Sequence, residues 1–411
     1  MNVSGRFLFG LMIALGAFAL AACDPAPLPI TEQEFERGTL DSYVVAQPTA
    51  LAFGPDGRLY VASLDGAIDA LTLNGTEVSD VEVVSTADEN EQILGLAVRM
   101  EGAGPAVYFS ENLILGGSNG DPFPNRIVRV AGERWGEREV VISGLPVSGH
   151  NHGTNALAFG GNGRLFIAQG GTTSSGAPSE PDDARWLGWD ETPLSGAILV
   201  ADIDGDGFDG AVTYDRQEAS ADTNQIGGDV RPWSTGHRNT FGFVIHSNGH
   251  MYSLDNGSSE PLPASRDCDT LEAPPDNDPD QLNLVVEGEY FGHPNRNRGR
   301  ENPEECVFVS PEMEDRDEAP NMLTLVPPSS NSIIEFRSEV FDGEWDGDLI
   351  FAWWTGGEIR RLTLSPDGKS IEDRELVAAD LGLPIAMAQA ADGTIFIAEF
   401  SGKISYLKPL G

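Results

Sequence analysis

Positive charge is scarce in this sequence. Its 411 residues hold 25 lysines and arginines against 65 aspartates and glutamates, which gives a formal net charge of −40. Only three of the cations are lysines, namely Lys369, Lys403 and Lys408. Binding to a nucleic-acid backbone depends on clustered lysines and arginines, so the composition excludes nucleic acid as a partner. The excess of carboxylates predicts a solvated acidic surface and says nothing about the fold.

Cysteine is also scarce, with three residues in the chain. The first, Cys23, follows Arg6, the apolar run 7–20 and the small residues Ala21 and Ala22. A short apolar run with such a cleavage site is typical of a secretory signal, and the cysteine after it is typical of a bacterial lipoprotein. We expect residues 1–22 to be a removed signal peptide, Cys23 to carry the lipid, and 23–39 to form a tether. The protein is then exported and lipid-anchored to the cell envelope on the periplasmic side, where the anchor alone contacts the membrane. The alternative is an ordinary secretory signal cut near Ala22.

The other two cysteines, Cys268 and Cys306, lie in polar, loop-like sequence. Disulfides form in the oxidising compartments that exported proteins reach. The sequence therefore predicts a disulfide between Cys268 and Cys306, with two free thiols as the alternative.

Helical periodicity is nearly absent, and a six-fold repeat takes its place. Each unit has a glycine-containing turn followed by a short apolar strand, and most units have another apolar strand before the turn. Continuous apolar runs of four residues suit strands buried on both faces, as in stacked blades. We predict an all-β, six-bladed propeller over residues 40–411, with long inserted loops at about 171–196 and 257–330 and a closing strand at about 40–46. The six apolar strands are 59–62, 106–109, 165–168, 251–254, 349–352 and 395–398.

This repeat predicts where a functional site lies. The two open ends of a strand, turn and strand hairpin point the same way. Residues just before the first strand and just after the second strand of each blade therefore gather on one face, at the mouth of the central channel. Polar side chains collect there, which makes the mouth the expected ligand site. They include Gln92, His152, Arg238, Asn239, Asp255 and Asn256.

Five blocks of the sequence stand out in order, at 92–97, 152–160, 236–243, 280–285 and 288–294. Together they resemble the glucose/sorbosone dehydrogenase family of soluble PQQ-dependent sugar dehydrogenases. The block 236–243, Gly-His-Arg-Asn-Thr-Phe-Gly-Phe, is similar to the family's Gly-x-Arg-Asn block, and 152–160 is similar to its histidine-bearing inner strand. The segments 280–285 and 288–294 resemble its "DELNLI…GxNYGWP" pattern, and 92–97 resembles "GLLGLAF". The ordered matches extend from about residue 45 to 409, over nearly all of the predicted propeller.

The resemblance implies a chemistry and a set of site residues. The family oxidises the anomeric hydroxyl of an aldose by hydride transfer to PQQ, with calcium against the quinone oxygens. His152 then matches the general base, a role that suits an imidazole, and His150 is a weaker candidate. Arg238 matches the arginine that supports negative charge on the cofactor. Gln92, Asn239, Asp255 and Asn256 match positions around the cofactor, and the carbonyls of Gly257 and Ser258 match the calcium ligands. The alternatives are structural: His152 hydrogen-bonded at a blade edge, and Arg238 paired with Asp255 or a neighbouring carboxylate.

The chain also departs from the family's pattern, as a divergent member would. The family's aspartate partner of the histidine is replaced by Gln169-Gly170-Gly171. Its lysine is replaced around Trp354-Thr355-Gly356, and its paired arginines are replaced by Leu383-Pro384-Ile385. PQQ carries three carboxylates, so the loss of these cations weakens its predicted binding. Either Arg360, Arg361 and loop arginines substitute for them, or the cofactor differs, or the site is no longer that of a dehydrogenase.

A second candidate metal site is the segment 202–207, Asp-Ile-Asp-Gly-Asp-Gly. Asp202, Asp204 and Asp206 alternate in the manner of the start of a calcium-binding loop, although Thr213 stands where the closing glutamate is expected. The alternative is an acidic turn at the end of a strand.

The sequence thus predicts a PQQ-dependent sugar or aldehyde dehydrogenase, with calcium as a second cofactor and a periplasmic electron acceptor as its partner. Two other functions remain open. The propeller could be a non-catalytic module that binds glycans or a protein partner, or a calcium-dependent hydrolase of the lactonase type.

Overall fold

The computed structural model describes residues 34–86, 92–113, 122–148, 151–174, 191–215, 224–257, 279–293 and 321–410. Several predicted positions lie outside these ranges: Cys23, His150, Ser258, Cys268 and Cys306. Within the ranges, no helix is long and apolar enough to cross a membrane.

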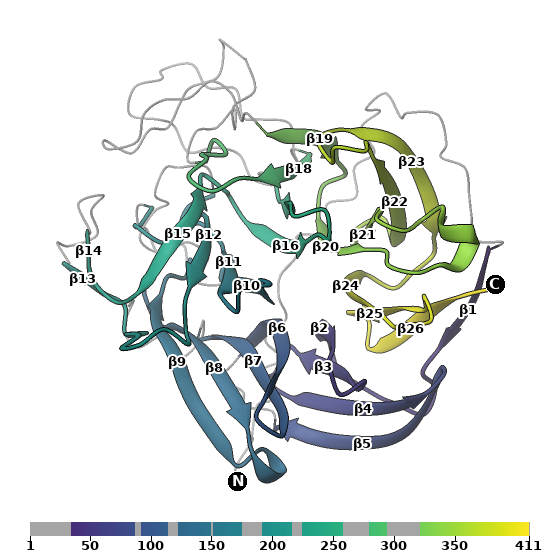
Figure 1. Cartoon of the computed structure of the whole chain (residues 1–411), viewed down its shortest axis with the longest axis horizontal. Coiled ribbons are helices and arrows are strands. Elements are labelled where there is room, and N and C mark those ends of the chain that lie inside the picture. Colours follow the sequence, from purple (N-terminus) through teal and green to yellow (C-terminus); the bar gives the residue numbers. More distant parts are fainter. Residues whose placement is uncertain are drawn as a thin grey trace, which may run out of the picture.

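Six four-stranded antiparallel sheets are arranged as blades around a central axis, and together they close a ring (Figure 1). The innermost strands of successive blades contact one another all the way around, including the last against the first. The predicted all-β, six-bladed propeller is therefore confirmed. The first three blades are β2 (Pro48–Phe53), β3 (Leu59–Ser63), β4 (Ile68–Asn74), β5 (Glu77–Ser85); β6 (Gln92–Glu101), β7 (Gly104–Asn112), β8 (Asn125–Ala131), β9 (Glu137–Leu145); and β10 (Thr154–Phe159), β11 (Leu165–Gln169), β12 (Ala197–Ala201), β15 (Val230–Thr235).

The remaining blades follow the same plan, and the last takes one strand from the start of the chain. They are β16 (Thr240–Ile245), β17 (Met251–Asp255), β18 (Asp280–Val285), β19 (Met322–Val326); β20 (Ser330–Glu335), β21 (Leu349–Trp353), β22 (Glu358–Leu364), β23 (Ile371–Ala378); and β24 (Pro384–Gln389), β25 (Ile395–Glu399), β26 (Lys403–Pro409), β1 (Phe35–Thr39). Outside the blades lie the hairpin of β13 (Thr213–Asp215) and β14 (Asn224–Gly227) and two short 3₁₀ turns, η3 (Glu133–Trp135) and η4 (Val340–Gly343).

The ring is closed by β1, which pairs with β26 from Phe35↔Pro409 to Thr39↔Ser405. The predicted closing strand at 40–46 is wrong, because these residues form a turn and irregular backbone after β1. The propeller accordingly begins at Phe35, inside the segment that the sequence assigns to a tether. Joining the two chain ends in one blade leaves no gap in the ring, so the last blade packs against the first.

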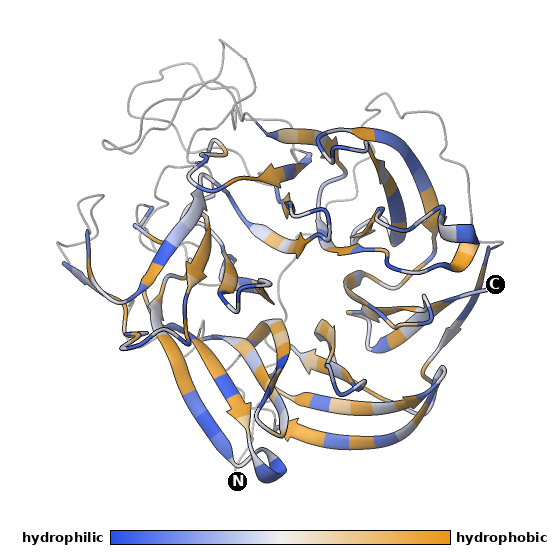
Figure 2. Ribbon diagram, viewed as in Figure 1, coloured by the Kyte–Doolittle hydropathy of each residue, from blue (hydrophilic) through white to orange (hydrophobic). Residues whose placement is uncertain are grey.

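All six predicted apolar strands are the second strands of their blades, and their residues are buried. They pack against the neighbouring blade: Tyr60 of blade 1 lies in one cluster with Leu96 and Phe109 of blade 2, and Tyr252 of blade 4 lies with Phe351 of blade 5. Each such side chain contributes roughly 1.5–3 kcal/mol by burial. Figure 2 shows orange inner strands and more blue on the outer strands β9 and β23. Inter-blade packing thus supplies the core of the ring.

The inserted loops are only partly as predicted. The first separates β11 from β12. The second prediction, 257–330, is wrong in part, because it contains β18 and β19, the outer strands of blade 4. Their residues pair in register with β17, for example Ser253↔Asn283.

The predicted meeting of strand ends is confirmed by the register of the blades. Thr154, the first residue of β10, pairs with Gln169, the last of β11, and Thr240 pairs with Asp255 in the same way. Residues immediately outside these pairs therefore share the mouth of the ring. The candidate site is built at this mouth, on the seam between blades 3 and 4.

Candidate functional site

His152 lies just before β10 and is 3% exposed. Two hydrogen bonds with Ser148 fix its backbone. The Ser148 hydroxyl accepts the His152 N–H at 2.6 Å, and the Ser148 N–H donates to the His152 carbonyl at 3.0 Å. The ring atom Nδ1 lies 3.1 Å from the backbone carbonyl oxygen of Gly171. A carbonyl only accepts, so Nδ1 carries the proton and Nε2 carries the lone pair.

Arg238 and Asn239 precede β16, and their backbone is fixed by the carboxylate of Asp255. The two oxygens of Asp255 accept the N–H groups of Arg238 at 3.1 Å and Asn239 at 2.8 Å. The Arg238 guanidinium is buried and donates from Nε to the Ser174 carbonyl at 2.6 Å. Its Nη1 lies 3.4 Å from the Asn256 carbonyl, so the cation spans the space between blade 4 and the loop after β11.

His152 and Arg238 meet at Gly171. The Gly171 N–H donates to the Arg238 carbonyl at 2.8 Å, while the Gly171 carbonyl accepts from the His152 ring. Burial, the Arg238 charge and His293 together hold the pKa of His152 well below its usual value. His152 is therefore neutral at neutral pH, the state in which an imidazole can accept a proton. His152 and Arg238, which the sequence places at the mouth, thus lie in one site around Gly171.

Two amides and a carboxylate continue the site across blade 4. The Asn239 amide donates to Asn256 Oδ1 at 3.2 Å, and its Oδ1 accepts from Asn155 at 2.8 Å. Asn256 in turn donates to Asp280 at 2.7 Å, and the second oxygen of Asp280 accepts the Gly257 N–H at 2.8 Å. The peptide that carries the predicted calcium-binding carbonyl of Gly257 is thus fixed beside the two amides.

Gln92 lies on the same rim, one blade away. It begins β6, pairs with Asn112 at the end of β7, and its carbonyl accepts from the Asn112 amide at 3.2 Å. The same amide donates to the Thr154 carbonyl at 3.0 Å, which links the rim of blade 2 to the start of β10.

The site also contains a buried carboxylate that the sequence pattern does not predict, Glu191. Its Oε1 lies 2.7 Å from Nε2 of His293, and their side chains are 6% and 3% exposed. Burial opposes ionisation, but His293 and the hydroxyls of Ser195 and Thr173 hold the pKa of Glu191 far below its usual range. Glu191 is therefore a carboxylate at neutral pH, close enough to His152 to favour its protonation.

Glu191 was missed because it lies in the inserted loop, where no strand pattern fixes a side chain, and His293 is 102 residues away. One signal was present. In the segment 288–294, which resembles GxNYGWP, His293 stands in place of the tryptophan. A titratable residue that replaces an aromatic one in an otherwise matching block points to altered chemistry nearby.

Two predicted substitutes for the missing cations serve other purposes. Arg360 pairs with Glu358 at 2.7 Å, and Arg361 pairs with Asp348 at 2.6 Å and with Glu375 at 2.7 Å. Both arginines lie on β22, the third strand of blade 5, so they stabilise that blade.

The alternating aspartates do not form the predicted calcium site. Asp204 instead accepts two hydrogen bonds from Arg99, at 2.6 and 2.8 Å. Among the described residues, which include Asp202, Asp204 and Asp206, no group of three or more histidines, cysteines or carboxylates could hold a metal ion. The acidic turn, the alternative for this segment, is what the structure has.

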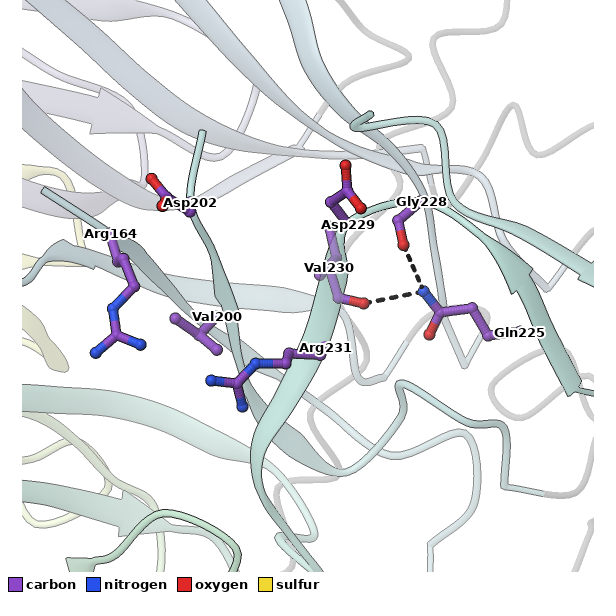
Figure 3. Close-up of a pocket in the computed structure, with 8 residues that line it drawn as sticks. All are labelled: Arg164, Val200, Asp202, Gln225, Gly228, Asp229, Val230 and Arg231. Carbon is purple, nitrogen blue, oxygen red and sulfur yellow. Dashed lines mark hydrogen bonds between the residues drawn. The ribbon is translucent and has the colours of Figure 1, made fainter. Parts of the chain in front are cut away.

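A cavity of about 510 Å³ lies elsewhere, on the opposite side of blade 3. Arg164, which lines it, follows the turn between β10 and β11, the end of the hairpin away from His152. Figure 3 shows Arg164, Arg231 and Asp202 among the side chains that line this cavity. It is separate from the predicted site at the mouth.

Comparison with known proteins identifies relatives of this chain. The family model for Glucose / Sorbosone dehydrogenase matches residues 45–408. The chain belongs to this family. Quinoprotein glucose dehydrogenase B of Acinetobacter calcoaceticus is 22% identical over 312 residues, which are 69% of this chain and 58% of that protein. The chain thus matches less than two thirds of the length of this relative of the glucose/sorbosone dehydrogenase family.

Solved structures share the fold. The PQQ-bound form of aldose sugar dehydrogenase from Streptomyces coelicolor superposes with a TM-score of 0.56 and 18% identity, covering 91% of this chain and 98% of that one. The calcium structure of a Trichoderma reesei carbohydrate-active enzyme of family AA12 has a TM-score of 0.62 and 14% identity, covering 93% and 97%. At these identities the likeness establishes the propeller and leaves the chemistry to the site residues.

Proposed function

We propose that this glucose/sorbosone dehydrogenase family member oxidises a sugar or aldehyde at the mouth of the propeller, with PQQ as the hydride acceptor. One observation carries the proposal. His152 and Arg238, from different blades, bind the two sides of Gly171, and the neutral imidazole carries its lone pair on Nε2.

Part of this site suits PQQ, a quinone that carries three carboxylates. Arg238 supplies a permanent positive charge, and Asn239 and Asn256 supply amides. The carboxylates of Asp255, Asp280 and Glu191 lie in the same region and are held by backbone and side-chain donors. Because these carboxylates make the surroundings negative, tight binding of PQQ requires a divalent cation as well. Gly257, whose peptide is fixed by Asp280, would hold calcium through its carbonyl.

PQQ, when bound, would supply a two-electron quinone as the acceptor of hydride from the carbon bearing the hydroxyl. His152 Nε2 accepts the hydroxyl proton as that carbon–hydrogen bond breaks, so the alcohol becomes a carbonyl and the imidazole becomes an imidazolium. Gly171 holds the ring in the tautomer that carries the lone pair on Nε2. Arg238 stabilises negative charge that develops beside it, and because its guanidinium is already fixed by Ser174, little reorganisation is needed.

The test is reconstitution of the protein with PQQ and calcium, followed by dye-linked oxidation of a panel of aldoses and aldehydes. Turnover is expected, and His152→Gln should lower kcat by roughly 10²–10⁴-fold, the usual contribution of a general base, with PQQ still bound. His250→Gln is the matched control, because His250 lies on the turn side of blade 4 against the Asp367 carbonyl. Full activity of His152→Gln would contradict the role of the base.

Two other results would replace the proposal. Saturable PQQ binding without turnover would favour a module that binds glycans or a partner. Hydrolysis of lactones that a chelator abolishes would favour a lactonase.

We also propose that the enzyme works at the cell envelope, exported and anchored through lipid on Cys23, and passes electrons to a periplasmic acceptor. The sequence Leu20-Ala21-Ala22-Cys23 supports this location. Labelled palmitate should be incorporated in the wild-type protein and absent from Cys23→Ala. Equal labelling of both proteins would refute the anchor. A disulfide between Cys268 and Cys306 suits the same compartment and would appear as a mass difference on reduction.

A further inference from the structure

We infer that Glu191, locked by His293, is the positioning residue for both His152 and Arg238. The inference rests on the proposed function and adds to it a carboxylate that acts on the base through a loop. Glu191 and His293 form one hydrogen-bonded pair. They act through the short loop 171–174, which follows β11.

The four residues of this loop divide into two functions. Its outer members hold the reactive groups: the Gly171 carbonyl accepts from His152, and the Ser174 carbonyl accepts from Arg238. Its inner members hold the carboxylate: the N–H groups of Thr172 and Thr173 donate to Glu191 at 3.0 and 2.9 Å. Glu191 thus fixes the middle of the loop, while the base and the cation are attached to its two ends.

The hydrogen bonds around Glu191 need two accepting oxygens, which a carboxylate has and an amide lacks. The backbone N–H groups of Thr172 and Thr173, their two hydroxyls, the Ser195 hydroxyl and His293 Nε2 all donate to its two oxygens. A glutamine would turn an NH₂ group toward some of these donors and leave them without an acceptor. The loop forms no strand, and these bonds join its two middle residues to Glu191.

The close packing around Gly171 shows how little freedom the arrangement has. A Cβ added to Gly171 would lie 2.8 Å from His293 Nε2, 3.0 Å from Glu191 Oε1 and 3.1 Å from the Arg238 carbonyl oxygen. All of these groups therefore surround one residue. A shift of the loop would move the acceptor of the His152 proton and the anchor of the guanidinium together.

The ring tautomer of His152 tests this inference without any cofactor. The apo protein, labelled with ¹⁵N-histidine, should show His152 as a single Nδ1–H tautomer, assigned by its loss in His152→Gln. In Glu191→Gln the signal should become a mixture of tautomers, and the affinity for PQQ with calcium should fall at least tenfold. Thr173→Val removes one hydroxyl donor to Glu191 and keeps the N–H, so it should change the tautomer ratio and the PQQ affinity less. It takes the place of Glu191→Gln if that variant does not fold.

Glu335→Gln is the matched control. Glu335 forms the other glutamate and histidine pair in the described ranges, with His246 at 3.6 Å, and accepts the Ser247 N–H at 2.9 Å, on the turn side of the ring. It should leave the His152 tautomer and the PQQ affinity unchanged.

An unaltered Nδ1–H tautomer in a folded Glu191→Gln protein, or an equal change in Glu335→Gln, would overturn the inference. This failure is separable from failure of the proposed function. The NMR result needs no PQQ, and turnover in a Glu191→Gln protein at the wild-type rate would leave the dehydrogenase assignment standing while removing the positioning role.

Discussion

Arg238 donates its Nε–H to the backbone carbonyl of Ser174 at 2.6 Å, across 64 residues of sequence. This bond joins the blade 4 rim to the loop after β11, the same loop whose Gly171 carbonyl holds the His152 ring. The cation and the base are therefore parts of one rigid arrangement, and disturbing either should affect both.

Replacement of Gly170 by alanine should displace the base. A Cβ there would lie 2.7 Å from Asn239 Oδ1 and 2.8 Å from His152 Cβ, so both side chains must move. A misplacement of this size is expected to lower kcat at least tenfold in the reconstituted enzyme. Gly161→Ala is the control, because a Cβ at Gly161 meets no atom within 4 Å. Equal kcat values for the two variants would show that the His152 position is tolerant.

His152 should make stability depend on pH. Burial lowers its folded pKa well below the unfolded value of 6.5, so between those two values the unfolded chain binds one more proton. The free energy of unfolding should therefore fall as the pH drops below about 6.5, by up to about 1.4 kcal/mol per pH unit. Chemical denaturation from pH 7 to pH 5 should show a shallower slope for His152→Gln. Parallel slopes would mean that His152 is not buried in its neutral form.

Glu191 acts in the same direction but in a lower pH window. Its folded pKa is lowered, so its contribution is present above the unfolded value of about 4.5 and is lost as the pH falls from there. Glu191→Gln should flatten the stability profile below pH 4.5 and leave the slope assigned to His152 in place.

The seams between blades should be sensitive to single methyl groups. A Cβ on Gly242 of β16 would clash with the backbone carbonyl of Asn331 in β20. Gly242→Ala should lower the free energy of unfolding by about 1–3 kcal/mol, because backbone cannot move aside as a flexible side chain can. Gly104→Ala, with open space around its Cβ, should change stability little. Thermal unfolding of both variants measures the difference, and equal melting temperatures would contradict the close packing.

Calcium binding should be independent of the acidic turn. Asp204 is 58% exposed in its pair with Arg99, so Asp204→Asn should cost at most about 1 kcal/mol of stability. Calcium-dependent PQQ binding should be retained in Asp204→Asn and lost in Asp280→Asn, which loosens the Gly257 peptide. The reverse result would mean that calcium binds at residues 202–206.

The sequence predicts the inner strands well and the closing strand poorly, for one physical reason. The inner strands are buried on both faces, so their apolar runs stand out between turns. The closing strand β1 is an edge strand in which Phe35 alone is buried, and its polar residues resemble a loop. The segment 40–46 is more apolar than β1, so the sequence pattern predicts the closing strand there. Val44 in that segment is nevertheless 87% exposed.

The candidate site divides in the same way. His152 and Arg238 are predictable, because hairpin geometry places the ends of paired strands at one mouth. Glu191 is not, since only the folded loop brings it to His293 and to the threonines. The false calcium site at 202–206 has the right residue types, but the turn directs Asp204 toward Arg99.

Equilibrium titration of the calcium-loaded protein with PQQ tests the central claim most directly. The account predicts saturable binding of one PQQ per chain, weakened at least tenfold by Arg238→Lys, because an ammonium cannot reproduce the forked contacts with Ser174 and Asn256. The exposed Arg231→Lys, on the far side of blade 3, should bind PQQ as the wild type does. Absence of saturable binding, or equal affinity in Arg238→Lys, would contradict a quinone site between His152 and Arg238.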